Sequence, residues 1–264
     1  MKKNIYLVLL FLFSFFSYFE TSYAFFDNLK KGKIKEEEIV NYFNDAVFVG
    51  DSVMLGFKYY QDIYHNLGKP KFLSTVSFAL RYAVSPNNSD FYPLYNGKKV
   101  SVEDALNLMN AKKVFISLGI NDVAITGVEK AVLNYETFIK RIREKNPDIE
   151  IYIMSTTYIV NGGERGSLNN YALSSLDNEI KKKVKDWNVE YIDIMSSLKD
   201  TNGYLSPYYS IDYYVHLSNS AYDIWVKILK DFSLKKLQEE RKEIIYSIVD
   251  EITNVVTKIS SFVY

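Results

Sequence analysis

Four short apolar runs, separated by stretches of helical spacing, limit the possible folds of this 264-residue chain more than any other feature. The runs are continuous rather than alternating, which is typical of strands buried on both faces. They cover residues 46–50, 113–119, 149–155 and 189–194, and the helical stretches cover 128–145, 168–187 and 218–232. This alternation predicts an α/β fold with a parallel sheet covered by helices on both faces.

The segment 57–110 is less regular. It contains an expected strand at 72–76, a turn at Asn96-Gly97 that favours a small hairpin, and a short helix at 102–109. We expect this segment to be an insertion that shapes the rim of a pocket.

Composition excludes several classes of function. The 32 basic and 32 acidic residues balance, which argues against binding to a nucleic-acid backbone. The chain has no cysteine, which excludes disulfides, thiolate metal sites and a cysteine nucleophile. Its two histidines lie far apart in sequence, so a histidine-rich metal site is not expected and any chemistry is metal-free or carboxylate-bound. We expect no metal site and no cofactor.

The first residues have the pattern of a secretory signal peptide. Lys2-Lys3 precede an apolar run at 5–19, and Ser22-Tyr23-Ala24 ends the pattern with small residues at the two positions that signal peptidase inspects. An uncleaved N-terminal anchor is the alternative. Both interpretations predict an extracytoplasmic protein, secreted or associated with the cell envelope, with a main domain at 25–233.

The C-terminal segment 234–264 is predicted to be an amphipathic helix. Its apolar residues alternate at spacings of three and four, namely Ile245, Ile248, Ile252, Val255, Ile259 and Phe262. Such a helix either packs on its own domain or mediates self-association or contact with a membrane surface, and the sequence leaves both open.

The chemistry of the chain centres on Ser52 and His216. Ser52 follows the first buried strand, and His216 ends the sequence Asp212-Tyr-Tyr-Val-His216. A serine becomes a nucleophile when a neutral imidazole takes its proton and a carboxylate fixes the tautomer of that imidazole. The other histidine, His65, is expected to be a surface residue at a helix end or in a loop.

An ester hydrolase also needs donors for the oxyanion. The Ser52 backbone N–H at a helix start and the Asn121 side chain in Gly119-Ile-Asn121-Asp122 are the candidates. Because the carboxyl ends of parallel strands share one edge, we expect these groups to meet there.

These motifs, in this order, resemble those of the SGNH, or GDSL, hydrolases. They are Gly50-Asp51-Ser52, Gly119-x-Asn121-Asp122 and Asp212…His216, and the resemblance covers about 46–232. It implies a flavodoxin-like three-layer α/β/α fold with an additional C-terminal helix. It also implies ester hydrolysis through an acyl-serine, with Ser52 as nucleophile and His216 as base. Asn121 and an N–H of the second block would complete the oxyanion hole.

The chain departs from the family pattern at two places. The commonest spacing puts the acid three residues before the histidine, where this chain has Tyr213, so Asp212 is the expected acid and Asp193 or a Ser-His dyad the alternative. No glycine stands in the second block around 75–78, so the Ser77 N–H is the expected third donor. Asp51 and Asp122 are expected to cap helices or brace loops.

Met54 occupies the place of the second glycine in a Gly-x-Ser-x-Gly elbow, which argues against the α/β-hydrolase fold.

The favoured function is a serine esterase that removes acyl groups, with acetyl as one candidate, from a carbohydrate or cell-wall polymer. Tyrosines near His216 and the loop 161–165 are suited to contact sugars, although 23 tyrosines in the chain make a cluster less informative. The alternatives are a lipid esterase or lysophospholipase, an acyltransferase of the same fold, and a glycan-binding protein without turnover. The tyrosines near His216 that are suited to contact sugars are Tyr204, Tyr208, Tyr209, Tyr213 and Tyr214.

Overall fold

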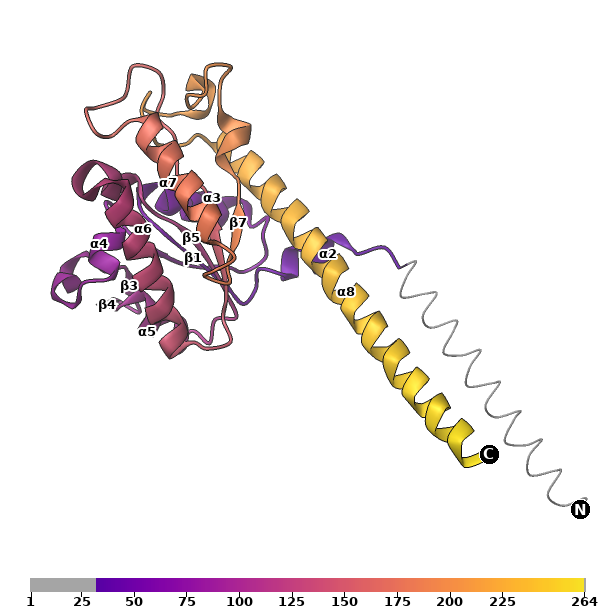
Figure 1. Ribbon diagram of the computed structural model, residues 1–264. Coiled ribbons are helices and arrows are strands. Elements are labelled where there is room, and N and C mark those ends of the chain that lie inside the picture. Colours follow the sequence, from indigo (N-terminus) through magenta and orange to yellow (C-terminus); the bar gives the residue numbers. More distant parts are fainter. Residues whose placement is uncertain (1–31, 264) are drawn as a thin grey trace, which may run out of the picture. The chain divides into compact units, whose positions relative to one another are not determined.

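The computed structural model describes residues 32–263 (Figure 1). The predicted signal peptide at 1–24 lies outside the described residues. The contacts divide the chain into two compact units, of which the larger spans 40–231 and the smaller includes the described residues 32–39 and 232–263. All candidate site residues belong to the larger unit.

A five-stranded parallel sheet forms the centre of the larger unit. Its strand order is β2-β1-β5-β6-β7, and every neighbouring pair is parallel. The prediction of a parallel sheet in an α/β fold is therefore confirmed. The strands are β1 (Ala46–Gly50), β2 (Lys71–Ser74), β5 (Lys113–Ser117), β6 (Glu150–Met154) and β7 (Glu190–Ile192).

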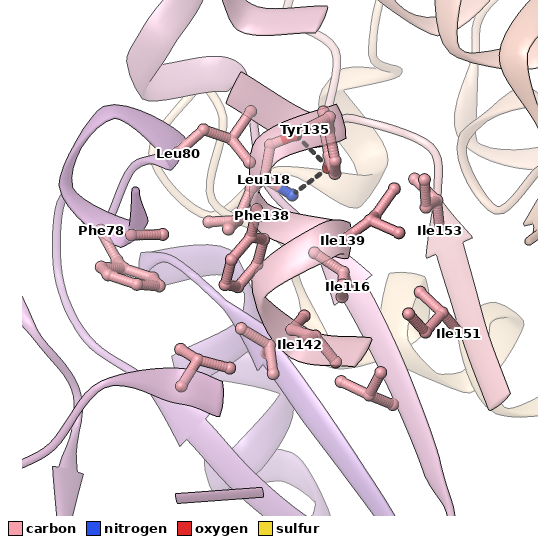
Figure 2. Packing of buried hydrophobic residues seen from close by; sticks show 14 of the residues in the cluster. Phe78, Leu80, Ile116, Leu118, Tyr135, Phe138, Ile139, Ile142, Ile151 and Ile153 are labelled. Atoms are coloured by element: carbon pink, nitrogen blue, oxygen red, sulfur yellow. Dashed lines mark hydrogen bonds between the residues drawn. The ribbon is translucent and has the colours of Figure 1, made fainter. Parts of the chain in front are cut away.

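One face of the sheet is aliphatic. Alternate strand residues such as Ile116 and Ile153 join a buried cluster with Phe138 and Ile142 of the covering helices (Figure 2). The covering helices are α4 (Leu80–Ala83), α5 (Val102–Leu108), α6 (Ile120–Lys145) and α7 (Asn170–Lys183).

The other face of the sheet is aromatic. Phe72, Phe48, Phe115 and Tyr152 occupy one row across β2, β1, β5 and β6, with ring centroids of neighbours 4.7–5.5 Å apart. Rings of α3 (Ser52–Tyr64) and of the first turns of α8 (Asn219–Val263) contact each other over this face, as between Phe57 and Trp225. The sheet thus lies between two helical layers.

Three elements differ from the predicted bounds. α6 begins at Ile120 rather than near 128, with non-helical backbone at Gly127. α3 extends to Tyr64, into the segment expected to be irregular. α8 is one helix from Asn219 to Val263, whereas the sequence predicts separate helices at 218–232 and 234–264. The predicted hairpin at Asn96-Gly97 is present, between β3 (Leu94–Tyr95) and β4 (Lys98–Lys99).

The smaller unit includes most of α2 (Glu36–Asn41) and residues 232–263 of α8. The Arg241 guanidinium donates to the Gly32 carbonyl and lies 3.3 Å from the Glu38 carboxylate. Along the predicted apolar seam, Ile245 is buried and Val255 is 51% exposed. Within the described residues, no helix is long and apolar enough to span a membrane. Self-association and membrane-surface contact through this segment remain predictions.

Candidate active site

Ser52 lies where β1 passes into α3. The turn is so tight that a Cβ on Gly50 would lie 2.5 Å from the Met54 Cβ and 2.8 Å from the Ser117 carbonyl oxygen, so only glycine fits. The Asp51 carboxylate caps α3 by accepting from the Val53 N–H at 2.9 Å. Ser52 is therefore the first residue of the helix, at the carboxyl edge of the sheet.

The structure brings Ser52, His216 and Asp212 together. His216 Nε2 lies 3.0 Å from Ser52 Oγ, and His216 Nδ1 lies 2.5 Å from Asp212 Oδ2. When Nδ1–H donates to Asp212, the Nε2 lone pair faces the serine hydroxyl and can accept its proton. This is the arrangement that general-base activation of a serine requires.

The Asp212 carboxylate is held by several donors. Partial burial tends to raise its pKa, but bonds from the His216 ring, the Tyr214 and His216 N–H groups and the Ser210 hydroxyl outweigh it and lower the pKa. Asp212 thus stays ionised beside the imidazole.

The unusual spacing of Asp212 and His216 is accommodated at Tyr213. Tyr213 has φ = 55°, a left-handed conformation that is uncommon for a bulky residue, and its side chain is 74% exposed. The alternative acid, Asp193, lies elsewhere: its carboxylate accepts from Ser196 and lies 3.7 Å from Lys181.

Asn121 reaches the site from the first turn of α6. Its amide nitrogen donates to Asp51 Oδ2 and to the Phe78 carbonyl, both at 3.2 Å. These bonds turn the nitrogen, rather than the oxygen, toward the Ser52 end of α3. Both lengths are at the upper limit of a good hydrogen bond, so one N–H can be shared with an oxyanion.

Ser77 lies in the loop between β2 and α4 with φ = 58°, a backbone conformation that favours glycine. The positive φ explains why the family pattern has glycine at this position. Serine adopts the same conformation here at the cost of some backbone strain. Within the described part of the chain, its N–H bonds to no acceptor, so it is free to donate to a ligand.

Two buried carboxylates hold the loops of the site. Burial raises the pKa of Asp51 to about 6, although the Val53 N–H and the nearby His216 oppose the rise. Burial likewise raises the pKa of Asp122, whose two oxygens accept from the Leu80 and Arg81 N–H groups. Asp122 thereby fixes the start of α4 near the start of α6.

Asp51→Asn should change how stability depends on pH. Because folding raises the pKa of Asp51 from 3.8 to about 6, the folded state binds this proton more tightly, so stability falls as the pH rises between these values. The variant lacks this loss, which is on the order of 3 kcal/mol for a shift of this size. Urea unfolding from pH 4 to pH 7 measures the difference between the two proteins, and parallel curves would contradict the assignment.

Two positioning residues were not found from the sequence. The Tyr135 hydroxyl accepts from the Leu118 N–H at 3.1 Å and donates to the Leu118 carbonyl at 2.9 Å, which fixes the backbone leading to Asn121 (Figure 2). The Arg81 guanidinium donates to the Asn121 carbonyl. Both contacts join residues distant in sequence, and no local motif signals them.

Comparison with protein families gives one match, to the GDSL-like Lipase/Acylhydrolase family over residues 48–224. The chain belongs to this family. The matched range of this GDSL-type serine hydrolase includes all of its candidate site residues, namely Ser52, Ser77, Asn121, Asp212 and His216. A search of curated proteins gave no match.

Solved structures with a similar fold include other GDSL-type proteins. A GDSL-like lipase from Bacteroides thetaiotaomicron has a TM-score of 0.53 at 17% identity, over 82% of this chain and 97% of its own. A protein provisionally named platelet activating factor, from Streptococcus pneumonia, has a TM-score of 0.55 at 19% identity, over 75% and 92%. At such identities the likeness shows the fold, which agrees with the predicted α/β/α architecture.

Among the described residues, no group of three or more histidine, cysteine or acidic side chains is placed to hold a metal ion.

Proposed function

We propose that this GDSL-type hydrolase is a secreted or envelope-associated esterase that removes acyl groups, acetyl among them, from a carbohydrate or cell-wall polymer. The observation that carries the proposal is the chain of contacts from Ser52 through His216 to Asp212. Ser52 attacks the ester carbonyl while His216 takes its proton, and the alcohol leaves with a proton from His216. Water then hydrolyses the acyl-serine by the same route.

The exposure of the site supports a polymer that carries small acyl groups. The side chains of His216 and Asp212 are 41% and 33% exposed, so the catalytic loop lies open at the sheet edge. An open site admits a bulky alcohol such as a glycan. A long acyl chain would instead need an apolar cleft to bury it.

The secreted location rests on the N-terminal pattern alone, namely Lys2-Lys3, the apolar run at 5–19 and Ser22-Tyr23-Ala24.

Acyl release from defined esters tests the proposal. The purified chain should release acetate from acetylated xylan or from O-acetylated peptidoglycan faster than fatty acid from lysophosphatidylcholine, with Ser52→Ala as the blank. Fatty-acid release alone would favour a lysophospholipase. Acetyl transfer to an added glycan, without free acetate, would favour an acyltransferase.

A further inference from the structure

A hollow of about 480 Å³ lies between two loops that leave the carboxyl edge of the sheet. One wall comes from the segment that follows β6 and leads into α7, with Glu164, Asn169, Asn170 and Tyr171. The other wall comes from the segment between β7 and α8, with Asn202 and Tyr204. The volume is in the range of small-molecule sites.

The first wall is preformed by its own hydrogen bonds. The Asn170 side chain bonds both the N–H and the carbonyl of Ile159, at 2.7 and 2.8 Å, and Glu164 accepts from the Asn170 N–H at 2.6 Å. Asn169 caps α7 by accepting from the Ala172 N–H at 2.9 Å. The shape of the hollow therefore does not depend on a ligand to order it.

Other polar groups of the hollow have no hydrogen-bond partner among residues 32–263. Within the described residues, the Asn202 side-chain amide and the Tyr171 and Tyr204 hydroxyls make no hydrogen bond. Tyr171 is 84% exposed, so its ring is available as a flat surface. Uncommitted amide and hydroxyl groups beside an aromatic ring suit a ligand with many hydroxyls and an apolar face.

The charge of the residues that line the hollow favours a neutral ligand over an anionic one. Among the described residues that line the hollow, Glu164 is the single charged one, and none is a lysine or an arginine. Phosphate and carboxylate ligands are normally held by such cations. A neutral sugar ring fits this lining better than an anionic one.

The segment that carries the first wall also contacts the catalytic loop at Tyr214, two residues before His216. The Val160 N–H donates to the Tyr214 carbonyl at 3.0 Å, and the Arg165 guanidinium lies 4.6 Å from the centre of the Tyr214 ring. The Leu205 N–H donates to the Ile159 carbonyl at 3.1 Å and joins the two walls.

We propose that this hollow is a subsite for one neutral pyranose ring of the glycan whose ester is held at Ser52. The proposal rests on the esterase function proposed above and specifies its substrate class. Tyr171 supplies the ring surface, and Asn202 supplies hydrogen bonds to hydroxyls. The ester-bearing residue and the ring in the hollow belong to the same chain of sugars.

The test compares kcat/KM on a glycan ester with kcat/KM on p-nitrophenyl acetate, which has no sugar. The glycan esters are O-acetylated xylo-oligosaccharides and O-acetylated chito-oligosaccharides, which separate a plant-type from an amino-sugar polymer. In Tyr171→Ala and Asn202→Ala, the ratio of glycan to p-nitrophenyl acetate should fall about fivefold or more, through a higher KM for the glycan. Tyr59→Ala, an exposed tyrosine on α3, is the matched control and should keep the wild-type ratio.

An unchanged ratio in both variants, for both glycans, would overturn the subsite. A fall of the same size in Tyr59→Ala would also overturn it, because the effect would not belong to the hollow. Binding of unacetylated xylotetraose and N-acetylchitotetraose to the full chain, measured by saturation-transfer NMR, separates the two proposals. Glycan binding that depends on Tyr171, without any ester hydrolysis, would refute the proposed esterase activity and leave the proposed subsite standing. Ester hydrolysis without such binding would refute the subsite alone.

Discussion

Ser52→Ala and His216→Ala should each lower kcat for p-nitrophenyl acetate by a factor on the order of 10⁴ to 10⁶. Ser52→Ala removes the nucleophile, and His216→Ala removes the base whose Nε2 lies 3.0 Å from Ser52 Oγ. Because the two side chains act as one unit, the double variant should be no slower than the worse single variant. Steady-state rates of the three proteins measure both effects.

His65 provides the control for the histidine variant. It is the other histidine of the chain, exposed at the end of α3 with φ = 49°, a conformation that asparagine tolerates. His65→Asn should keep the wild-type rate, and all variants should keep the wild-type circular dichroism. Full turnover in a folded His216→Ala protein would contradict the proposed mechanism.

Asp212→Asn should lower kcat by a factor on the order of 10² to 10⁴ at neutral pH. The carboxylate accepts from His216 Nδ1 and so keeps the Nε2 lone pair toward Ser52, whereas an amide can donate to Nδ1 and stabilise the wrong tautomer. The loss should lie in kcat, with KM little changed.

Asp193→Asn is the matched control, because Asp193 is the other acid that the sequence left open. The Asp193 carboxylate contacts Ser196 and Lys181, away from His216. The kcat of the Asp193→Asn variant should therefore stay within about twofold of the wild-type value. A loss below tenfold in Asp212→Asn would favour a Ser52-His216 dyad, and a large loss in Asp193→Asn would show that the acid has been misassigned.

The sheet could be predicted because its strands carry a local signal. The central strands β1, β5 and β6 each contain a continuous apolar run, because burial on both faces disfavours polar residues inside the strand. The continuity of α8 past residue 233 also has a local reason. No glycine or proline occurs between 219 and 263, so no residue of the kind that usually ends a helix stands near 233.

The sequence predicts which residues lie close together at the candidate site, but not the contacts that hold them there. Ser52, Asn121 and His216 follow from residue type, order and the edge of a parallel sheet. The left-handed backbone of Ser77 and Tyr213 has no local signal, because neither residue is a glycine. The bonds from Tyr135 to Leu118 and from Arg81 to Asn121 depend on the tertiary fold. These contacts decide how firmly the predicted residues are held.

Labelling with a fluorophosphonate tests whether Ser52 is an activated nucleophile, without knowledge of the natural substrate. The folded wild-type chain should be labelled covalently, and both Ser52→Ala and His216→Ala should lose the label. Failure to label the folded wild-type protein, or labelling that persists in Ser52→Ala, would contradict the account.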